Sequence, residues 1–265
     1  MSTPTAPGTD WQEVIPADED ARFARYAEQL AALQRKHARG GKLQRALHTK
    51  ANVSARAEFE VLSDLPEHAR QGLFAQPAKY DAYVRYSNGQ GVAHGDRTPD
   101  VRGIGIKLVG VAGKKLTPGM QDERTQDFLL IKTKSAPFRN ADEFVAFVLA
   151  GENQALFLPR AFMTLGVRRT FAILRGMLPS LMAPVASLAT THYYTPLPSR
   201  LGPYAVHHSL TPDAKNEPGA KPGAAREYLG EEMASRLRNG PVSYDFQLQF
   251  YLDADRTPIE DSSVE

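Results

Sequence analysis

The chain has 265 residues, of which 42% are hydrophobic and 23% charged, proportions typical of a globular protein. Its 32 Lys and Arg against 30 Asp and Glu leave a net charge of +2, which excludes a polybasic protein that coats nucleic acid. Cysteine is absent, which excludes disulfides, zinc–thiolate sites, iron–sulfur clusters and cysteine nucleophiles together.

The N-terminal residues 1–19 carry neither the basic nor the apolar region of a secretory signal. Their Pro, Thr and Asp content predicts a flexible arm. No apolar run approaches the roughly 18 residues that a membrane span needs. We therefore expect a cytoplasmic protein without a membrane span, with one domain over residues 20–265.

The first half of the chain predicts one helix and then several strands. Apolar residues recur at steps of three and four over 20–38, which is typical of an amphipathic helix. Residues 52–61 alternate between apolar and polar, which indicates a half-buried strand. We expect further strands, separated by Gly, Asn, Asp and Pro turns, over 80–87, 103–109 and 127–133.

The second half mixes helices with strands. We expect helices over 141–150, 154–162, 168–178 and 225–238, and strands over 204–210 and 243–252, with a Pro/Gly/Lys loop over 213–224. Antiparallel strands with helices inserted between them predict an α+β fold built on a sheet or barrel.

Generic catalytic motifs are missing: the chain has no GxxxxGK[ST], no HExxH and no GxSxG. Three local clusters remain, and each has an ordinary structural interpretation as packed or solvated residues. They are Arg45–Lys50 before the cleanest strand, Tyr83–Gly89 with Asp100–Gly103 after it, and Thr190–Pro196 followed by Ser199–Pro203.

Taken in order, these clusters resemble the haem-dependent catalase superfamily, and most closely its small catalase-related members. An Arg-x-x-His element that enters the first barrel strand of that family matches Arg45 and His48. Its Arg-[Phe/Tyr]-Ser element matches Arg85-Tyr86-Ser87, and its Pro-Arg-Gly-like turn matches Val101-Arg102-Gly103. The resemblance implies an antiparallel catalase-like β-barrel with inserted and flanking helices.

The resemblance covers roughly residues 20–265. The family places a tyrosine seven residues before the Arg of Arg-Leu-Gly, and Tyr193 stands at that spacing from Arg200. A Gln-Asp-Phe strand start and a Pro-Ile-Glu-Asp element are also present, as Gln126-Asp127-Phe128 and Pro258-Ile259-Glu260-Asp261.

Three departures from the family pattern stand out. Thr125 or Gln126 occupies the place of the distal asparagine of full-length catalases. Ala189 replaces the family arginine four residues before the proximal tyrosine. The chain also stops soon after Asp261, where relatives run on, so truncation at the C-terminus is one interpretation.

The resemblance implies a role for each matched residue. Tyr193 is the expected proximal ligand of the iron of haem b, with Tyr194 as the alternative. His48 is the expected distal acid and base, because an imidazole with a pKa near 6.5 can take and return a proton at neutral pH. Arg45, Arg85 and Arg200 are expected on the haem propionates, and Ser87 and Leu47 beside the distal pocket.

The resemblance therefore implies a haem enzyme that acts on hydrogen peroxide or organic hydroperoxides, with a small-molecule electron donor and no nucleic acid as partners. The missing asparagine favours a peroxidase-type enzyme over an efficient catalase. Two alternatives stay open: a haem-binding sensor or sequestering protein with little turnover, and a haem-free barrel that binds a small apolar ligand. The reducing substrate and the oligomeric state, including a homo-oligomer, stay open as well.

Overall fold

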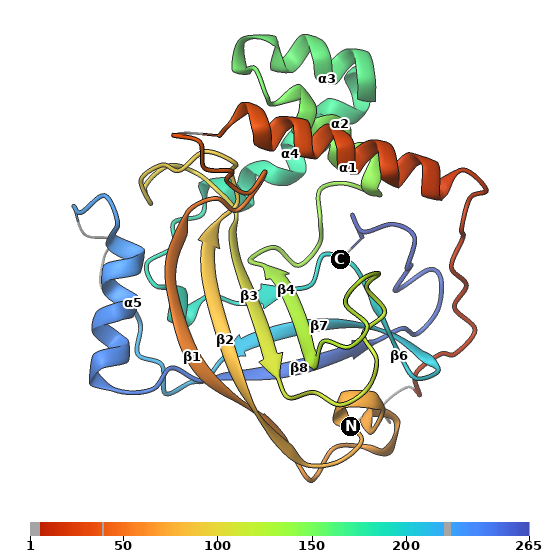
Figure 1. Ribbon diagram of the computed structural model, residues 1–265, viewed down its shortest axis with the longest axis vertical. Coiled ribbons are helices and arrows are strands. Elements are labelled where there is room, and N and C mark those ends of the chain that lie inside the picture. Colours follow the sequence, from red (N-terminus) through yellow and green to blue (C-terminus); the bar gives the residue numbers. More distant parts are fainter. Residues whose placement is uncertain (1–5, 39, 220–223, 265) are drawn as a thin grey trace.

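The computed structural model describes residues 6–38, 40–219 and 224–264. Their eight strands form one antiparallel sheet with the order β1-β2-β3-β4-β5-β7-β6, and β8 pairs with β7 (Figure 1). The strands are β1 Ala51–Val61, β2 Ala78–Asn88, β3 Arg102–Val109, β4 Thr125–Ile131, β5 Tyr193–Tyr194, β6 Ser199–Leu201, β7 Tyr204–Pro212 and β8 Tyr244–Phe250. The sheet curls strongly, so one of its faces encloses the core.

The alternation predicted from the sequence separates the two faces of the sheet. In β3, Ile104, Ile106 and Leu108 are buried in the core, while the residues between them face outward. The inner face also carries aromatic rings from distant strands, and Phe59 stacks on Phe128 with centroids 6.2 Å apart. The apolar inner face of the sheet therefore forms the core, and its outer face is free to contact other elements of the chain.

The described strands form a curled half-barrel, which confirms the expected antiparallel catalase-like barrel with inserted and flanking helices. The edge strands β1 and β8 meet through side chains, with the rings of Phe59 and Phe246 packed edge to face at 5.1 Å. Helix α5 (Tyr228–Asn239) lies beside β1 (Figure 1), and a Cβ at Gly230 would come within 2.4 Å of the carbonyl oxygen of Asn52. Side-chain packing and α5 thus cover an edge that no further strand pairs with.

Helices α1 to α4 cover the outer face of the sheet at one end (Figure 1). They are α1 Glu19–Lys36, α2 Ala141–Ala150, α3 Phe157–Leu165 and α4 Val167–Met182, with the short 3-10 turns Glu67–Ala69, Gly72–Phe74, Gln154–Leu156 and Leu188–Thr190 elsewhere. The side chain of Asn140 caps α2 by accepting a hydrogen bond from Glu143 N, as the Asn-Ala-Asp-Glu sequence indicates. None of the helices in the described residues is long and apolar enough to cross a bilayer.

The predicted elements are found with small shifts at their ends. The helix expected over 225–238 begins at Tyr228, and the loop before it includes residues 220–223, which lie outside the described residues. The described part of the N-terminal arm is bonded to the sheet region rather than loose. Gly8 N donates to Tyr251 O at 2.8 Å, and Trp11 Nε1 donates to Pro203 O at 2.8 Å.

Candidate functional site

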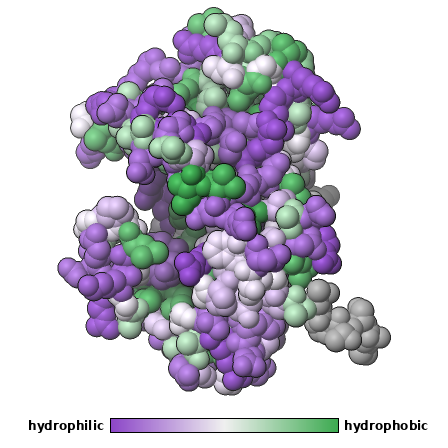
Figure 2. Space-filling view, turned by 90° about the vertical axis from the view of Figure 1, so that its right-hand side faces the viewer, coloured by the Kyte–Doolittle hydropathy of each residue, from purple (hydrophilic) through white to green (hydrophobic). Residues whose placement is uncertain are grey.

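A cavity of about 3020 Å³ lies between the outer face of β2–β4 and helices α1–α4. The space-filling view shows the surface hollowed between the upper and lower parts of the molecule, with apolar side chains at the edge of the hollow (Figure 2). Five residues predicted from the sequence line this cavity together: Arg45, Leu47, His48, Arg85 and Ser87. The fold therefore brings these five residues to one cavity, although they are up to 42 positions apart in the sequence.

The imidazole of His48 is held by its own backbone and by Ser87. The backbone has a φ of 51°, in the left-handed region that a non-glycine residue adopts only when its surroundings impose it. Here His48 N donates to Gly89 O at 2.9 Å, and Arg85 Nη2 donates to His48 O at 2.7 Å. The ring atom Nδ1 lies 3.0 Å from Ser87 Oγ, so hydrogen bonds fix both the backbone of His48 and the Nδ1 side of its ring.

Gly103 makes room for that ring, a role that was not predicted from the sequence. A Cβ at this position would lie 2.5 Å from His48 Cε1 and 2.9 Å from Nδ1, so the imidazole rests on bare backbone. A glycine inside a strand often marks such a close approach. The Arg102-Gly-Ile-Gly-Ile alternation carried this signal, because glycine takes positions on the outer face where a strand usually has a side chain.

The surroundings of His48 favour its neutral form, mainly through burial. Burial lowers the pKa of His48 most, the nearby guanidiniums of Arg85 and Arg45 lower it further, and Asp100 opposes them. Burial also lowers the pKa of Arg85, with Arg45 adding to the effect. The two arginines are therefore close enough to repel each other at the edge of the cavity. The guanidinium of Arg45 has neither a hydrogen bond nor an ion pair within the described residues.

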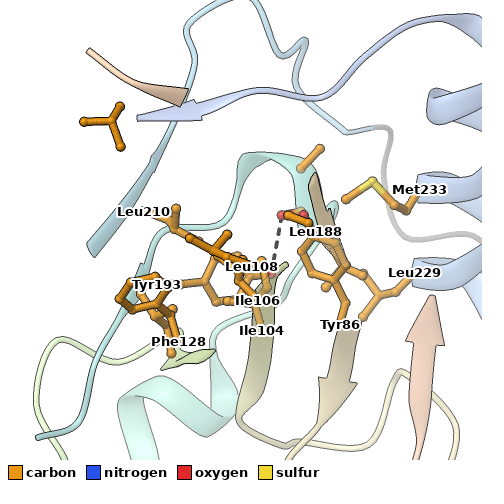
Figure 3. Close-up of a cluster of buried hydrophobic side chains, with 14 of the residues drawn as sticks. Tyr86, Ile104, Ile106, Leu108, Phe128, Leu188, Tyr193, Leu210, Leu229 and Met233 are labelled. Carbon is orange, nitrogen blue, oxygen red and sulfur yellow. Dashed lines mark hydrogen bonds between the residues drawn. The ribbon is translucent and has the colours of Figure 1, made fainter. Parts of the chain in front are cut away.

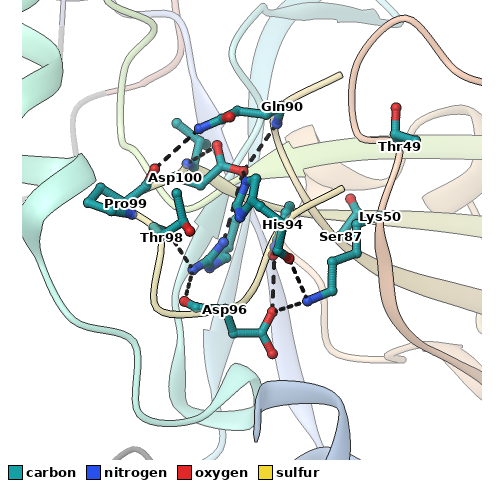
Figure 4. A network of polar contacts seen from close by, with 12 residues as sticks. Thr49, Lys50, Ser87, Gln90, His94, Asp96, Thr98, Pro99 and Asp100 are labelled. Carbon is teal, nitrogen blue, oxygen red and sulfur yellow. Dashed lines mark hydrogen bonds and ion pairs between the residues drawn. The ribbon is translucent and has the colours of Figure 1, made fainter. Parts of the chain in front are cut away.

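A polar network fixes the loop that carries Gly89 (Figure 4). Asp100 Oδ2 accepts hydrogen bonds from Gln90 N at 3.1 Å and from His94 Nε2 at 2.9 Å. Asp96 is also buried and pairs with Lys50 Nζ at 2.6 Å. This network ties the loop to the segment just after His48. The loop whose Gly89 oxygen accepts from His48 N is therefore itself held by buried polar contacts.

Tyr193, the expected iron ligand, does not line the cavity. Its side chain is fully buried in the core beside Tyr86 and Leu108, away from the cavity (Figure 3). Burial raises its pKa well above the usual 10, and its hydroxyl donates to Leu188 O at 3.4 Å. Ala189 is buried in the same core, which explains why no arginine stands there. The spacing to Arg200 could not show which face of the sheet each tyrosine occupies.

Tyr194 points the other way, as the next residue in a strand must. It lines the cavity and pairs with Ile131 of β4, which pairs with Gly103. Ser87, Gly103, Ile131 and Tyr194 thus form one row across four neighbouring strands. Tyr194 therefore shares the sheet wall with His48 instead of facing it across the cavity.

Two other sequence expectations are not brought to the site. Arg200 is exposed and donates through Nε to Gly202 O at 3.1 Å, outside the cavity. Thr125 and Gln126 lie at the opposite end of β4, six and five residues from Ile131 and so roughly 17–20 Å from the level of His48. The absence of an asparagine at those positions therefore says nothing about the ligands of this cavity.

Comparison with solved structures supports the fold. No protein-family model matches the chain, and no curated protein matches it. The structure resembles catalase A from Saccharomyces cerevisiae with a TM-score of 0.59 at 16% sequence identity. The fold is catalase-like. The match covers 97% of this chain and 53% of that catalase, so the chain spans about half the length of its structural relative.

The lining of the cavity in this catalase-like chain suits the ring of a haem and its acid groups, but it offers no tyrosine opposite His48 as a ligand of the iron. Its lining is mostly apolar, and the arginine pair suits acid groups on such a ring. The tyrosines in its lining, Tyr83 and Tyr194, both belong to the sheet wall that carries His48. The described residues also contain no cluster of three or more His, Cys, Asp or Glu that could hold a metal ion. The expected tyrosinate opposite His48 is thus absent from the described residues.

Proposed function

We propose that the cavity binds haem and that the protein reacts with peroxides, as the catalase-like fold suggests. The observation that carries the proposal is the pair Arg45 and Arg85 beside the His48–Ser87 contact, in the wall of an apolar cavity. An apolar ring with carboxylates at one edge is the ligand chemistry that such a wall recognises.

The arginines would hold the acid groups of the ring. Arg85 is half-buried and uses Nη2 on backbone oxygens of His48 and Thr49, at 2.7 and 3.3 Å. Arg45 adds a second guanidinium that repels it. A carboxylate between the two cations would relieve this repulsion and could accept bidentate hydrogen bonds. The ligand would then be oriented by the same residue that fixes the backbone of His48.

His48 would move the proton in a reaction with peroxide. Its lowered pKa keeps the ring neutral at pH 7. When Nδ1 donates to Ser87 Oγ, the free nitrogen Nε2 carries the lone pair and can accept a proton from a bound peroxide. Haem, when bound, supplies the redox chemistry that no side chain here can perform.

The size of the cavity supports a peroxidase-type reaction over a narrow peroxide site. At about 3020 Å³ it exceeds the roughly 300–1,000 Å³ of ordinary ligand pockets, which leaves space for a second reactant beside the ring. An organic hydroperoxide or a small electron donor would fit that space. The preference for a peroxidase-type reaction therefore rests on the volume of the cavity and not on the missing asparagine.

Titration with haemin, followed by absorbance, tests ring binding. We expect the Arg45→Ala/Arg85→Ala variant to bind haemin about tenfold more weakly or worse, the scale for losing charge-assisted hydrogen bonds. Arg56→Ala is the matched control, because Arg56 lines the same cavity from β1. Equal affinity of both variants, or no spectral change with the wild-type protein, would overturn the proposal.

A second candidate is a haem-binding protein with little turnover, and the sheet-wall position of both lining tyrosines favours it. The comparison of haemin with metal-free protoporphyrin separates the two candidates. Equal affinities, together with no oxidation of a dye by hydrogen peroxide, would favour the carrier. Tighter haemin binding and dye oxidation that is lost in His48→Ala would favour the enzyme.

A further inference from the structure

Lys132 lies at the edge of the cavity, directly after the last residue of β4. Its backbone N donates to Arg102 O at 2.9 Å, which fixes the start of its side chain next to β3. Its Nζ donates a long hydrogen bond of 3.3 Å to Ala183 O, just after α4. Within the described residues this ammonium has no carboxylate partner.

Among the charged groups around Lys132, the buried guanidinium of Arg102 has the largest effect on its ammonium. Arg102 is 3% exposed, and its Nε and Nη1 have no hydrogen-bond partner in the structure. Asp100 is its nearest carboxylate, with Oδ2 4.0 Å from Nη1, but that oxygen already accepts from His94 and Gln90. Lys132 therefore faces a positive charge that is only partly compensated.

These surroundings disfavour the charged amine. Burial lowers the pKa of Lys132 to about 8, Arg102 lowers it as well, and Asp100 opposes both. At pH 7 about one tenth of the side chain is then a free amine with a lone pair. A desolvated lysine beside another cation is the arrangement that activates lysine as a nucleophile.

We propose that Lys132 is a nucleophilic amine that forms an imine with an apolar aldehyde bound in the cavity. The lone pair of Nζ attacks the carbonyl carbon to form a C–N bond. The two protons that Nζ loses pass through solvent to the carbonyl oxygen, which breaks its bond to carbon and leaves as water. The product is a C=N bond, with no change in oxidation state. No haem takes part, so the inference stands apart from the proposed function.

The walls around Lys132 suit an aldehyde with a hydrocarbon tail. Ile131 precedes it in the chain, and Leu181, Pro184 and Val185 line the cavity near the oxygen that Nζ contacts. These side chains offer the tail contacts but no acid that would pair with the amine. A charged or strongly polar carbonyl compound would lose its hydration there without replacement.

Reductive trapping tests the site. The protein is incubated with hexanal and cyanoborohydride at pH 7.5, and the modified lysines are identified by peptide mass spectrometry. The matched control is Lys107, which lines the same cavity but pairs with Asp127. The shift of the Lys132 pKa from 10.5 to about 8 gives about two-hundredfold more free amine at this pH than an ordinary lysine has.

We expect at least tenfold more label on Lys132 than on Lys107, loss of that label in Lys132→Arg, and no change at Lys132 in Lys107→Arg. Even labelling of the two lysines would overturn the inference. A second measurement needs no variant that might alter the fold: NMR titration of the ¹³C-dimethylated lysines of the wild-type protein. A Lys132 resonance that titrates above pH 10 would also overturn it.

Discussion

Replacement of Gly103 by alanine tests whether the orientation of His48 depends on this bare stretch of backbone. The new Cβ would lie 2.5 Å from His48 Cε1, whereas ordinary contacts begin at 3.4 Å. The ring must therefore move by about 1 Å, because both its own backbone and β3 are fixed by hydrogen bonds. Gly105→Ala is the matched control, since it lies on the same face of β3 and its Cβ would meet only Leu129 Cδ2 at 3.4 Å.

The cost of this movement follows from the contacts that it breaks. A shift of this size lengthens the 3.0 Å contact between His48 Nδ1 and Ser87 Oγ beyond hydrogen-bond range, at about 0.5–1.5 kcal/mol. An off-rotamer side chain adds about 0.5–1.5 kcal/mol. The lower chain entropy of alanine in the unfolded state offsets about 0.4–1 kcal/mol. We expect Gly103→Ala to lower the free energy of unfolding by about 1–2 kcal/mol and Gly105→Ala to leave it unchanged or raised.

Urea unfolding measures these differences, and NMR titration of the His48 Cε1 proton measures the effect on the site. In the wild-type protein, burial holds the pKa of His48 below 6.5. A displaced ring gains solvent, so its pKa should rise towards 6.5 in Gly103→Ala only. An unchanged His48 titration together with wild-type peroxide reactivity in Gly103→Ala would refute the reasoning.

Three further predictions concern the core, the helices and the tyrosines. Burial lowers the pKa of His208 to about 4, so the unfolded state binds more protons than the folded state between about pH 6.5 and 4. The free energy of unfolding therefore decreases as the pH is lowered through this range, by on the order of 3 kcal/mol. His208→Leu should remove this part of the pH dependence in urea titrations, and an unaltered slope would contradict it. Burial raises the pKa of Glu143, but hydrogen bonds from Arg169 and Arg139 outweigh it and lower this pKa to about 2. Because Arg169 belongs to α4, Glu143→Gln should cost about 2 kcal/mol at pH 7, whereas Asp142→Asn, which affects the more exposed ion pair with Arg22, should cost less than 1; equal costs would contradict a role of Glu143 in holding α2 to α4. Tyr193→Phe loses one long hydrogen bond in the core and should keep the wild-type haem spectrum; loss of that spectrum would restore Tyr193 as the ligand.

Local patterns in the sequence predicted most elements of the fold. The period-two alternation in β1 and β8 arises because one face of each strand is buried and the other is wet, and a chain carries that signal by itself. The Asn140 cap and the apolar periodicity did the same for α2. The two-residue strand β5 and the short β6 could not be predicted, since so few residues show no period.

Some features of the candidate site could likewise be predicted from the sequence, and others only the tertiary structure shows. Arg45, His48, Arg85 and Ser87 were named from short motifs, because each motif keeps its residues within one local segment. Which tyrosine reaches the cavity was decided only by the tertiary structure, because a shift of one residue along a strand moves a side chain to the other face and spacing to a distant arginine does not record that face. The register Ser87–Gly103–Ile131–Tyr194 sets it, and the curl of the sheet buries Tyr193 in the core. The partly compensated charge beside Lys132 is likewise a property of three segments brought together, and no one of them reveals it alone.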